Sequence, residues 1–229
     1  MKLHSVHTQM EKIYFRRMHA SAVDPYNAVM LAWPGELDQT WDDIVEGELP
    51  AELIGGTFWS NGPGRLLHGG RLIHPFDGNG YLRAIRFLPG KKVRLQARMV
   101  QTQTFRDEEK AGKVVWAGLG TLPSDSWWSN LWAPLNRNVA NTCVLPWAGK
   151  ILALWEGGWP HAVNPETLET LGPESFDGAL PKGGAFLAHT RWDARQNRLL
   201  GLSPRILGPK TEFTGRELDA SGRQISAHT

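Results

Sequence analysis

The sequence is poor in cysteine and has no long apolar run, and each absence narrows what the protein can be. Its 229 residues include one cysteine, Cys143, which excludes an intramolecular disulfide framework and a cysteine-based zinc cluster. No stretch approaches the ~20 apolar residues of a membrane-spanning helix, and charged residues occupy the place of a signal peptide's apolar core. We therefore expect a cytoplasmic protein in a reducing compartment.

A strong net charge is also absent. The formal charge is +2, and no cluster of Lys and Arg is dense enough to follow a phosphate backbone, so we expect no nucleic-acid partner. The motifs of serine hydrolases, P-loop proteins and dinucleotide-binding proteins do not occur either. The 41% apolar and 21% charged residues are typical of a folded domain.

What the sequence does contain is a series of short β-prone segments. Residues 1–46 are irregular apart from a helical candidate over 9–20, and we interpret them as an N-terminal arm. From Gly47 onward, short apolar runs alternate with Gly, Pro, Asn and Asp, which predicts an all-β domain over 47–229. The expected strands cover residues 56–60, 81–87, 92–104, 113–117, 141–146, 150–155, 185–190, 198–202 and 211–218.

The grouping of these strands favours a β-propeller or a barrel. The clearest hairpin runs from 141–145 through a turn at 147–149 into 151–155. A propeller blade takes four strands in ~40–50 residues, so roughly 180 residues would build about four blades.

Tryptophan is abundant and unevenly placed. Seven of the eleven tryptophans lie between Trp116 and Trp159, which suits a thick core, a ligand wall or a membrane surface. Residues 122–137 interrupt the β pattern, and Ser124 or Asp125 is expected to cap a short helix there. Its aromatic face would contain Trp128, Leu131 and Trp132.

Two polar residues at the ends of apolar segments are the candidates for chemistry. His189 ends the apolar segment 185–188, where a propeller would direct a ligand towards its axis, and neutral imidazole suits divalent iron. Glu156 directly follows the apolar strand predicted over 150–155, where an unpaired charge is costly, so it needs a partner. On the residues alone, a core or surface histidine and an exposed glutamate at a strand end remain the alternatives.

Several short motifs taken together resemble the carotenoid cleavage oxygenases. Asn61-Gly-Pro63, Phe76-Asp-Gly-Asn-Gly80 and Leu154-Trp-Glu156 occur in the order and spacing of that family. The resemblance implies part of a seven-bladed β-propeller with a helical cap. It also implies a dioxygenase that cleaves a double bond of a carotenoid or apocarotenoid with O₂. A relative, the retinal pigment epithelium isomerase, uses the same scaffold on retinyl esters.

The same resemblance implies roles for individual residues. His189 matches the first of four histidines that bind a non-haem Fe(II), and Glu156 matches a glutamate that accepts a hydrogen bond from a later ligand histidine. Only His228 follows His189, and Ser60 stands where the family usually has arginine. We therefore expect three of the four ligands to be absent. The chain alone would be inactive, unless it self-associates or a missing C-terminal half completes the centre.

Trp127, Trp128 and Trp132 resemble the apolar patch near the family's tunnel mouth, which predicts peripheral contact with a membrane. The alternative is a helix packed on the propeller. Two further hypotheses concern the whole chain: a non-catalytic truncated propeller that binds a partner or an apolar ligand, and a Trp-rich carbohydrate-binding β-domain.

Overall fold

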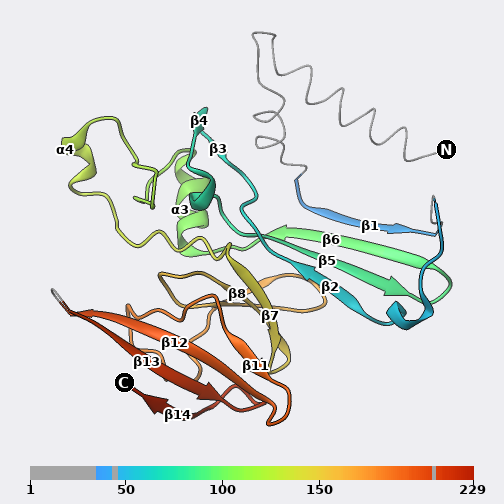
Figure 1. Ribbon diagram of the computed structural model, residues 1–229. Coiled ribbons are helices and arrows are strands. Elements are labelled where there is room, and N and C mark those ends of the chain that lie inside the picture. The colour runs from blue at the N-terminus through green and yellow to red at the C-terminus, as the bar shows by residue number, and fades with distance from the viewer. Residues whose placement is uncertain (1–34, 43–45, 208–209) are drawn as a thin grey trace.

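The computed structural model describes residues 35–42, 46–207 and 210–229 (Figure 1). Within them, antiparallel strands form three four-stranded sheets and one two-stranded ribbon. The first sheet has the order β1-β6-β5-β2. Its strands are β1 (Leu37–Trp41), β2 (Thr57–Ser60), β5 (Tyr81–Leu88) and β6 (Lys92–Met99).

The second and third sheets are simple meanders, in which neighbours in sequence are neighbours in space. The second sheet contains β7 (Cys143–Trp147), β8 (Lys150–Leu154), β9 (His161–Val163) and β10 (Thr170–Pro173). The third contains β11 (Arg191–Asp193), β12 (Arg198–Leu207), β13 (Lys210–Leu218) and β14 (Gln224–His228). Successive four-stranded meanders are the arrangement of propeller blades.

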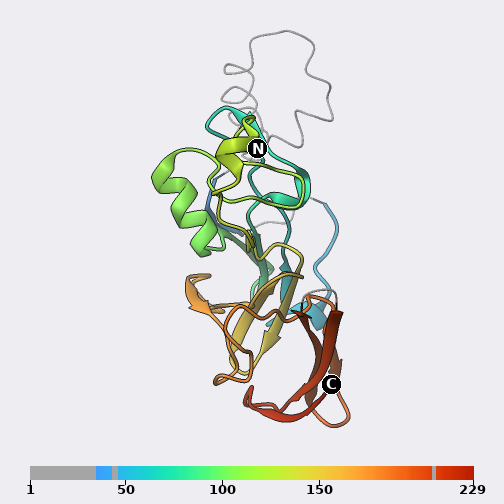
Figure 2. The same cartoon turned by 90° about the vertical axis from the view of Figure 1, so that its left-hand side faces the viewer.

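The remaining elements lie in sequence either between strands of the first sheet or between the first and second sheets. They are the ribbon β3 (Leu67–His68) and β4 (Arg71–Leu72), the 3-10 helices η1 (Ala51–Leu53) and η2 (Pro75–Asp77), and the helices α3 (Gln103–Ala111) and α4 (Trp127–Asn130). Figure 2 shows α3 and α4 at the end of the molecule opposite the third sheet.

The expectation of about four blades is one too high for the described residues. The reason lies in residues 100–140, which form α3, α4 and irregular chain instead of a fourth sheet. The strand predicted over 92–104 ends at Met99, because the Thr102 hydroxyl accepts a hydrogen bond from the Phe105 amide at 3.1 Å and starts α3.

Two other predicted strands are wrong. Residues 113–117 form no strand, because the amides of Val115 and Trp116 donate to the Glu108 carboxylate at 3.0 and 3.3 Å instead of to a neighbouring strand. Residues 185–190 are irregular, and β11 begins only at Arg191.

The hairpin expected between 141 and 155 is confirmed as β7 and β8. Its two central turn residues, Ala148 and Gly149, both have positive φ, at 49° and 72°. That backbone matches the twist of the flanking strands, which explains the tight connection. The boundary predicted between an N-terminal arm and the domain at residue 47 stays a prediction. Residues 37–41 of this arm form β1, which pairs with β6 of the first sheet. The helical candidate over 9–20 lies outside the described residues.

Apolar side chains fill the spaces between neighbouring sheets. One buried cluster joins the first sheet to the second and includes Leu82, Ile151 and Val163. Another packs the second sheet against the third and includes Leu154 and Phe186. Each central sheet face is therefore covered by the next sheet, as in a propeller.

A buried ion pair connects α3 to the irregular chain before β7. The side chains of Arg137 and Glu108 are 1% and 0% exposed, and the guanidinium donates to both carboxylate oxygens. Arg137 Nε also donates to the carbonyl of Asp77 at 3.1 Å. One pair thus joins α3, the chain before β7 and η2.

Removal of one member of this pair should strongly destabilise the fold. We expect Glu108→Gln to lower the free energy of unfolding by about 3–5 kcal/mol, because it leaves the Arg137 charge buried without its counter-charge. Urea unfolding followed by circular dichroism measures this. The matched control is Glu109→Gln, whose carboxylate is 44% exposed and should change stability by under about 1 kcal/mol. Equal effects of the two substitutions would contradict the prediction.

Candidate metal-binding site

His189 lies on the irregular segment immediately before β11, the first strand of the third sheet. The residues before it are held at two points: the Phe186 amide donates to the Gly158 carbonyl at 3.1 Å, and the Leu187 amide to the Leu202 carbonyl at 2.8 Å. Phe186 and Ala188 are fully buried, whereas the His189 side chain is 77% exposed. A rigid apolar support therefore presents an accessible imidazole.

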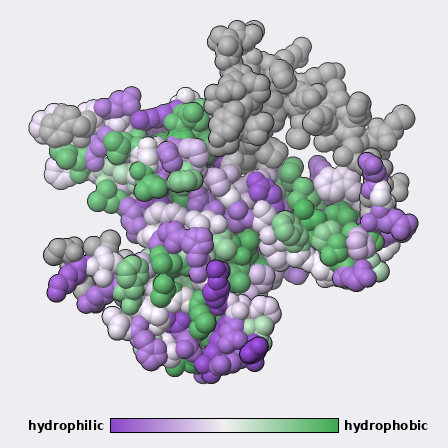
Figure 3. Space-filling view, viewed as in Figure 1, coloured by the Kyte–Doolittle hydropathy of each residue, from purple (hydrophilic) through white to green (hydrophobic). Residues whose placement is uncertain are grey.

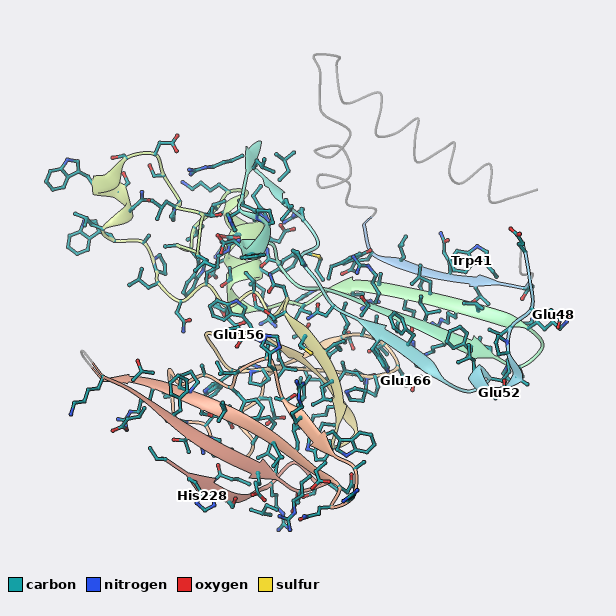
Figure 4. All side chains as sticks on the ribbon, in the orientation of Figure 1. Trp41, Glu48, Glu52, Glu156, Glu166 and His228 are labelled. Atoms are coloured by element: carbon teal, nitrogen blue, oxygen red, sulfur yellow. The ribbon has the colours of Figure 1, made fainter. Side chains whose placement is uncertain are left out.

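Glu156 comes from the second sheet, two residues after β8 ends at Leu154. Its Oε1 lies 3.0 Å from Nε2 of His189, and its Oε2 accepts a hydrogen bond from the Ala188 amide at 3.3 Å. The Oε1 contact lacks hydrogen-bond geometry, so this buried oxygen has no hydrogen-bond partner among the described residues. Figure 4 shows Glu156 near the middle of the molecule, between α3 and the third sheet. The fold thus brings both predicted site residues together.

The pair can do two things chemically. A neutral imidazole is a metal ligand, and an adjacent carboxylate can hold one ring nitrogen and orient the other. In the part of the chain that the structure describes, however, no three His, Cys, Asp or Glu side chains gather closely enough to hold a metal ion. These residues therefore supply one imidazole and one carboxylate, and they do not by themselves fit a complete iron centre.

The other described histidines lie away from this pair and have structural positions. His74 precedes η2, and its Nδ1 accepts a hydrogen bond from the Phe76 amide at 3.2 Å, so it holds the turn at the start of this helix. His68 is buried, at 4% exposed. Burial, reinforced by the charge of Arg65, lowers the pKa of His68.

His228 lies in β14, where it pairs with Gly215 of β13. In Figure 4 it lies at the outer edge of the third sheet, far from Glu156. The second Ala-His-Thr motif is therefore not part of the candidate site.

The aromatic segment forms a short helix, α4, but it begins after Ser126 instead of Ser124 or Asp125 and ends at Asn130. Of the expected aromatic face, only Trp128 lies in the helix, because Leu131 and Trp132 follow its end. Trp128 is 64% exposed and Trp132 is 88% exposed. The Trp127 side chain lies outside what the structure describes. Figure 3 shows apolar residues on this face of the molecule as several separate patches. None of the helices in the described ranges has the length and apolar character to cross a membrane.

Solved structures confirm the class of fold. The chain superposes on a variant of Synechocystis apocarotenoid oxygenase with a TM-score of 0.81 and 32% identity, over 91% of this chain and 45% of that one. The cobalt-substituted form of that oxygenase matches with a TM-score of 0.78 and 34% identity, over 86% of this chain and 42% of that one. The fold is therefore part of an oxygenase-type β-propeller.

The family follows from the sequence comparison. Residues 32–229 match the family described as retinal pigment epithelial membrane protein, and the chain belongs to this family of carotenoid cleavage oxygenases. The apocarotenoid-15,15'-oxygenase of Synechocystis is 41% identical over 162 residues, which is 70% of this chain. Carotenoid cleavage dioxygenase 7 of Oryza sativa is 40% identical over 197 residues, or 81% of this chain.

Not all matching relatives have carotenoid names. Isoeugenol monooxygenase of Pseudomonas nitroreducens is 32% identical over 171 residues, which is 75% of this chain. The chain spans about a third of the length of these three curated relatives, at 33%, 31% and 34%.

A second buried histidine lies apart from the pair. His161, whose place after Trp159-Pro160 favours a cavity-lining position, begins β9, is 6% exposed and lines a groove. Burial and the charge of Arg106 lower the pKa of His161 to about 4, against an opposing effect of the Trp159 carbonyl. The ring is therefore neutral at pH 7.

This pKa makes stability depend on pH in a defined window. The unfolded chain binds a proton at His161 below about pH 6.5, whereas the folded chain resists it down to about pH 4. Stability should therefore fall by roughly 3 kcal/mol as the pH decreases between these values. His161→Gln should remove this loss, and His228→Gln should not. Urea midpoints measured from pH 7 to pH 4 provide the check, and identical curves for both variants would refute the assignment.

Proposed function

We propose that this chain carries the N-terminal portion of the Fe(II) site of an oxygenase that cleaves a carbon–carbon double bond of a carotenoid or apocarotenoid. The observation that supports it most is the juxtaposition of His189, which precedes β11, and Glu156, which follows β8, at 3.0 Å. Membership of the family and the likeness to apocarotenoid oxygenase structures support the reaction class.

The residues of this chain would act by position. The Ala188 amide holds one oxygen of Glu156, and the second oxygen lies against the imidazole. The negative charge of this carboxylate beside Nε2 would favour a bound cation, and the accessible imidazole offers a ring nitrogen to a metal ion. The buried segment 185–188 prevents the ligand from moving with the surface. Iron, when bound, would supply the activation of O₂.

Local metal binding tests the role of His189 without relying on activity. Addition of Co(II) to the ¹⁵N-labelled 229-residue chain at pH 7 should broaden the amide signals of residues next to His189 and Glu156. His189→Ala should abolish this broadening, because the pair then loses its imidazole. Glu156→Gln should weaken binding about tenfold or more, because it removes the negative charge beside the imidazole.

The control for the metal test is His228→Ala, which removes an exposed histidine of the same sheet. Its broadening pattern should match that of the unchanged chain. Broadening that persists in His189→Ala would exclude the proposed ligand. Loading with Fe(II) followed by O₂-dependent bleaching of an apocarotenal then tests the reaction. Bleaching that rises with the square of protein concentration would indicate that two copies complete the centre.

We further propose that the segment around α4 contacts a membrane at its surface. Trp132 is 88% exposed, and Leu131 and Leu135, at 59% and 75%, lie close to it in sequence. Large apolar side chains exposed together on a soluble domain mark a binding surface. An indole ring at the headgroup level would retain its polar edge in water, and substrates of this class dissolve in bilayers.

Substitution of the exposed indoles should weaken vesicle binding. We expect Trp128→Ser/Trp132→Ser to lower partitioning into phosphatidylcholine vesicles by about tenfold or more, from the loss of buried apolar area. Co-sedimentation measures the bound fraction. Trp192→Ser serves as the control, because Trp192 is 60% exposed but belongs to β11 of the third sheet. An equal loss in both proteins would argue against a role for α4.

A further inference from the structure

A groove of about 300 Å³ opens beside the start of α3, apart from the two residues of the candidate metal site. Its walls come from six places in the sequence. They are the start of α3, the chain after α3 at Trp116, the chain before β7, the segment that leads into β9, the end of β10 at Pro173, and the loop before residue 185. The lining residues that matter chemically are Arg106, Trp116, Asn138, Trp159, His161 and Lys182.

The groove has an unbalanced positive charge. Arg106 and Lys182 are exposed, and neither side chain has an ion pair or hydrogen bond within the described ranges. No Asp or Glu lines the groove. The nearby carboxylate of Asp107 is already engaged, because it accepts hydrogen bonds from Gln103 Nε2 at 2.7 Å and Trp116 Nε1 at 3.0 Å.

The helix that borders the groove adds to this charge. α3 has nine residues and no acidic residue in its first turn, so the positive end of its dipole is not neutralised. The Thr102 hydroxyl caps the Phe105 amide only. Gln103 and Thr104 at the helix start line the groove, and their amides have no partner within the helix.

A buried polar atom in the same groove lacks a partner. His161 is 6% exposed, and its Nδ1 makes no hydrogen bond within the part of the chain that the structure describes. An unsatisfied buried polar atom costs about 1–3 kcal/mol, which a ligand oxygen could recover by accepting its hydrogen. This observation is independent of the helix dipole and of the two surface cations.

The rest of the wall is apolar and aromatic. The indole nitrogens of Trp116 and Trp159 already donate, to Asp107 and to the Pro181 carbonyl at 3.0 Å, so both rings can offer only carbon surface to a ligand. Pro173 adds further apolar surface. The volume is at the lower end of the range for small-molecule sites, which suits a ligand with a single ring.

We propose that this groove binds a small aromatic carboxylate, with its ring against Trp116 and Trp159 and its carboxylate between Arg106, Lys182 and the start of α3. This site is additional to the proposed oxygenase function. The ligand would complete the hydrogen bonding of His161 and neutralise the helix end. The loop that carries Trp159 continues back to Glu156, so occupancy of the groove would also stiffen the chain beside the candidate metal site.

Three probes separate the contribution of the aromatic ring from that of the carboxylate. Benzoate carries both ring and charge, benzamide carries the ring without the charge, and acetate carries the charge without the ring. Titrations of the ¹⁵N-labelled chain at pH 7 should show saturable shifts for benzoate with a Kd of the order of 1 mM. The indole N–H signals of Trp116 and Trp159 and the amide of Gln103 should shift most. Benzamide and acetate should each bind at least about tenfold more weakly.

Substitutions locate the carboxylate. Arg106→Gln and Lys182→Gln should each weaken benzoate binding by about tenfold, because each removes one charge-assisted contact. Arg195→Gln, an exposed arginine between β11 and β12, makes the same change of charge elsewhere and should leave the Kd unchanged. Thermal melting of every variant checks that the fold is retained.

The proposal fails if benzamide binds as well as benzoate, since the cations would then play no part. It also fails if acetate binds as well as benzoate, which would indicate an adventitious ion only, or if the shifts map outside the groove. The Co(II) broadening at His189 should be unchanged in Arg106→Gln, so failure here leaves the proposed oxygenase site untouched.

Discussion

The buried ion pair between Arg137 and Glu108 is the contact on which the position of residues 100–140, the segment outside the three large sheets, depends. Residues 100–140 share no sheet ladder with the blades, so isolated contacts hold them in place, among them the Gly80 amide that donates to the Val139 carbonyl at 2.7 Å. Glu108 anchors the amides of Val115 and Trp116 while it pairs with Arg137, and Arg137 reaches the carbonyl of Asp77. A buried ion pair is stable only when all of its polar atoms have partners. The loss of one partner at this junction therefore strongly destabilises the fold.

Two asparagines perform the corresponding task between the first and second sheets. Asn61 Nδ2 donates to the carbonyls of Ala140 and Cys143 at 2.8 and 3.1 Å, at the start of β7. Asn141 Nδ2 donates to the carbonyls of Phe76 and Gly78 at 2.9 and 2.7 Å. The Asn-Gly-Pro motif thus supplies a donor to the chain at β7, and the Phe-Asp-Gly-Asn-Gly motif supplies two carbonyl acceptors to Asn141. These contacts align the first sheet with the second. The third sheet packs against the second, and His189 lies at its start, beside Glu156.

The strands with strong alternation or apolar runs were predictable, and so were the hairpin at Ala148-Gly149 and the two candidate site residues. Strands of low apolar content were not: β1, β10 and β14 are mostly exposed, and their pairing comes from a neighbouring strand and not from their own pattern. The strand proposed over 113–117 failed for a related reason. Val114 and Val115 have the composition of a strand, but the amides of Val115 and Trp116 donate to a glutamate on a helix, a contact that no local pattern reveals.

The sequence by itself determined the all-β class, the family and the identity of His189 and Glu156 as candidates, because short motifs and residue chemistry are local properties of the chain. Only the tertiary structure decided that these two side chains lie 3.0 Å apart, that His68 and His161 are buried, and that a cationic aromatic groove forms beside α3. Each of these depends on segments distant in sequence. Burial, dielectric environment and charge proximity are set by such neighbours, and no single stretch of residues encodes them.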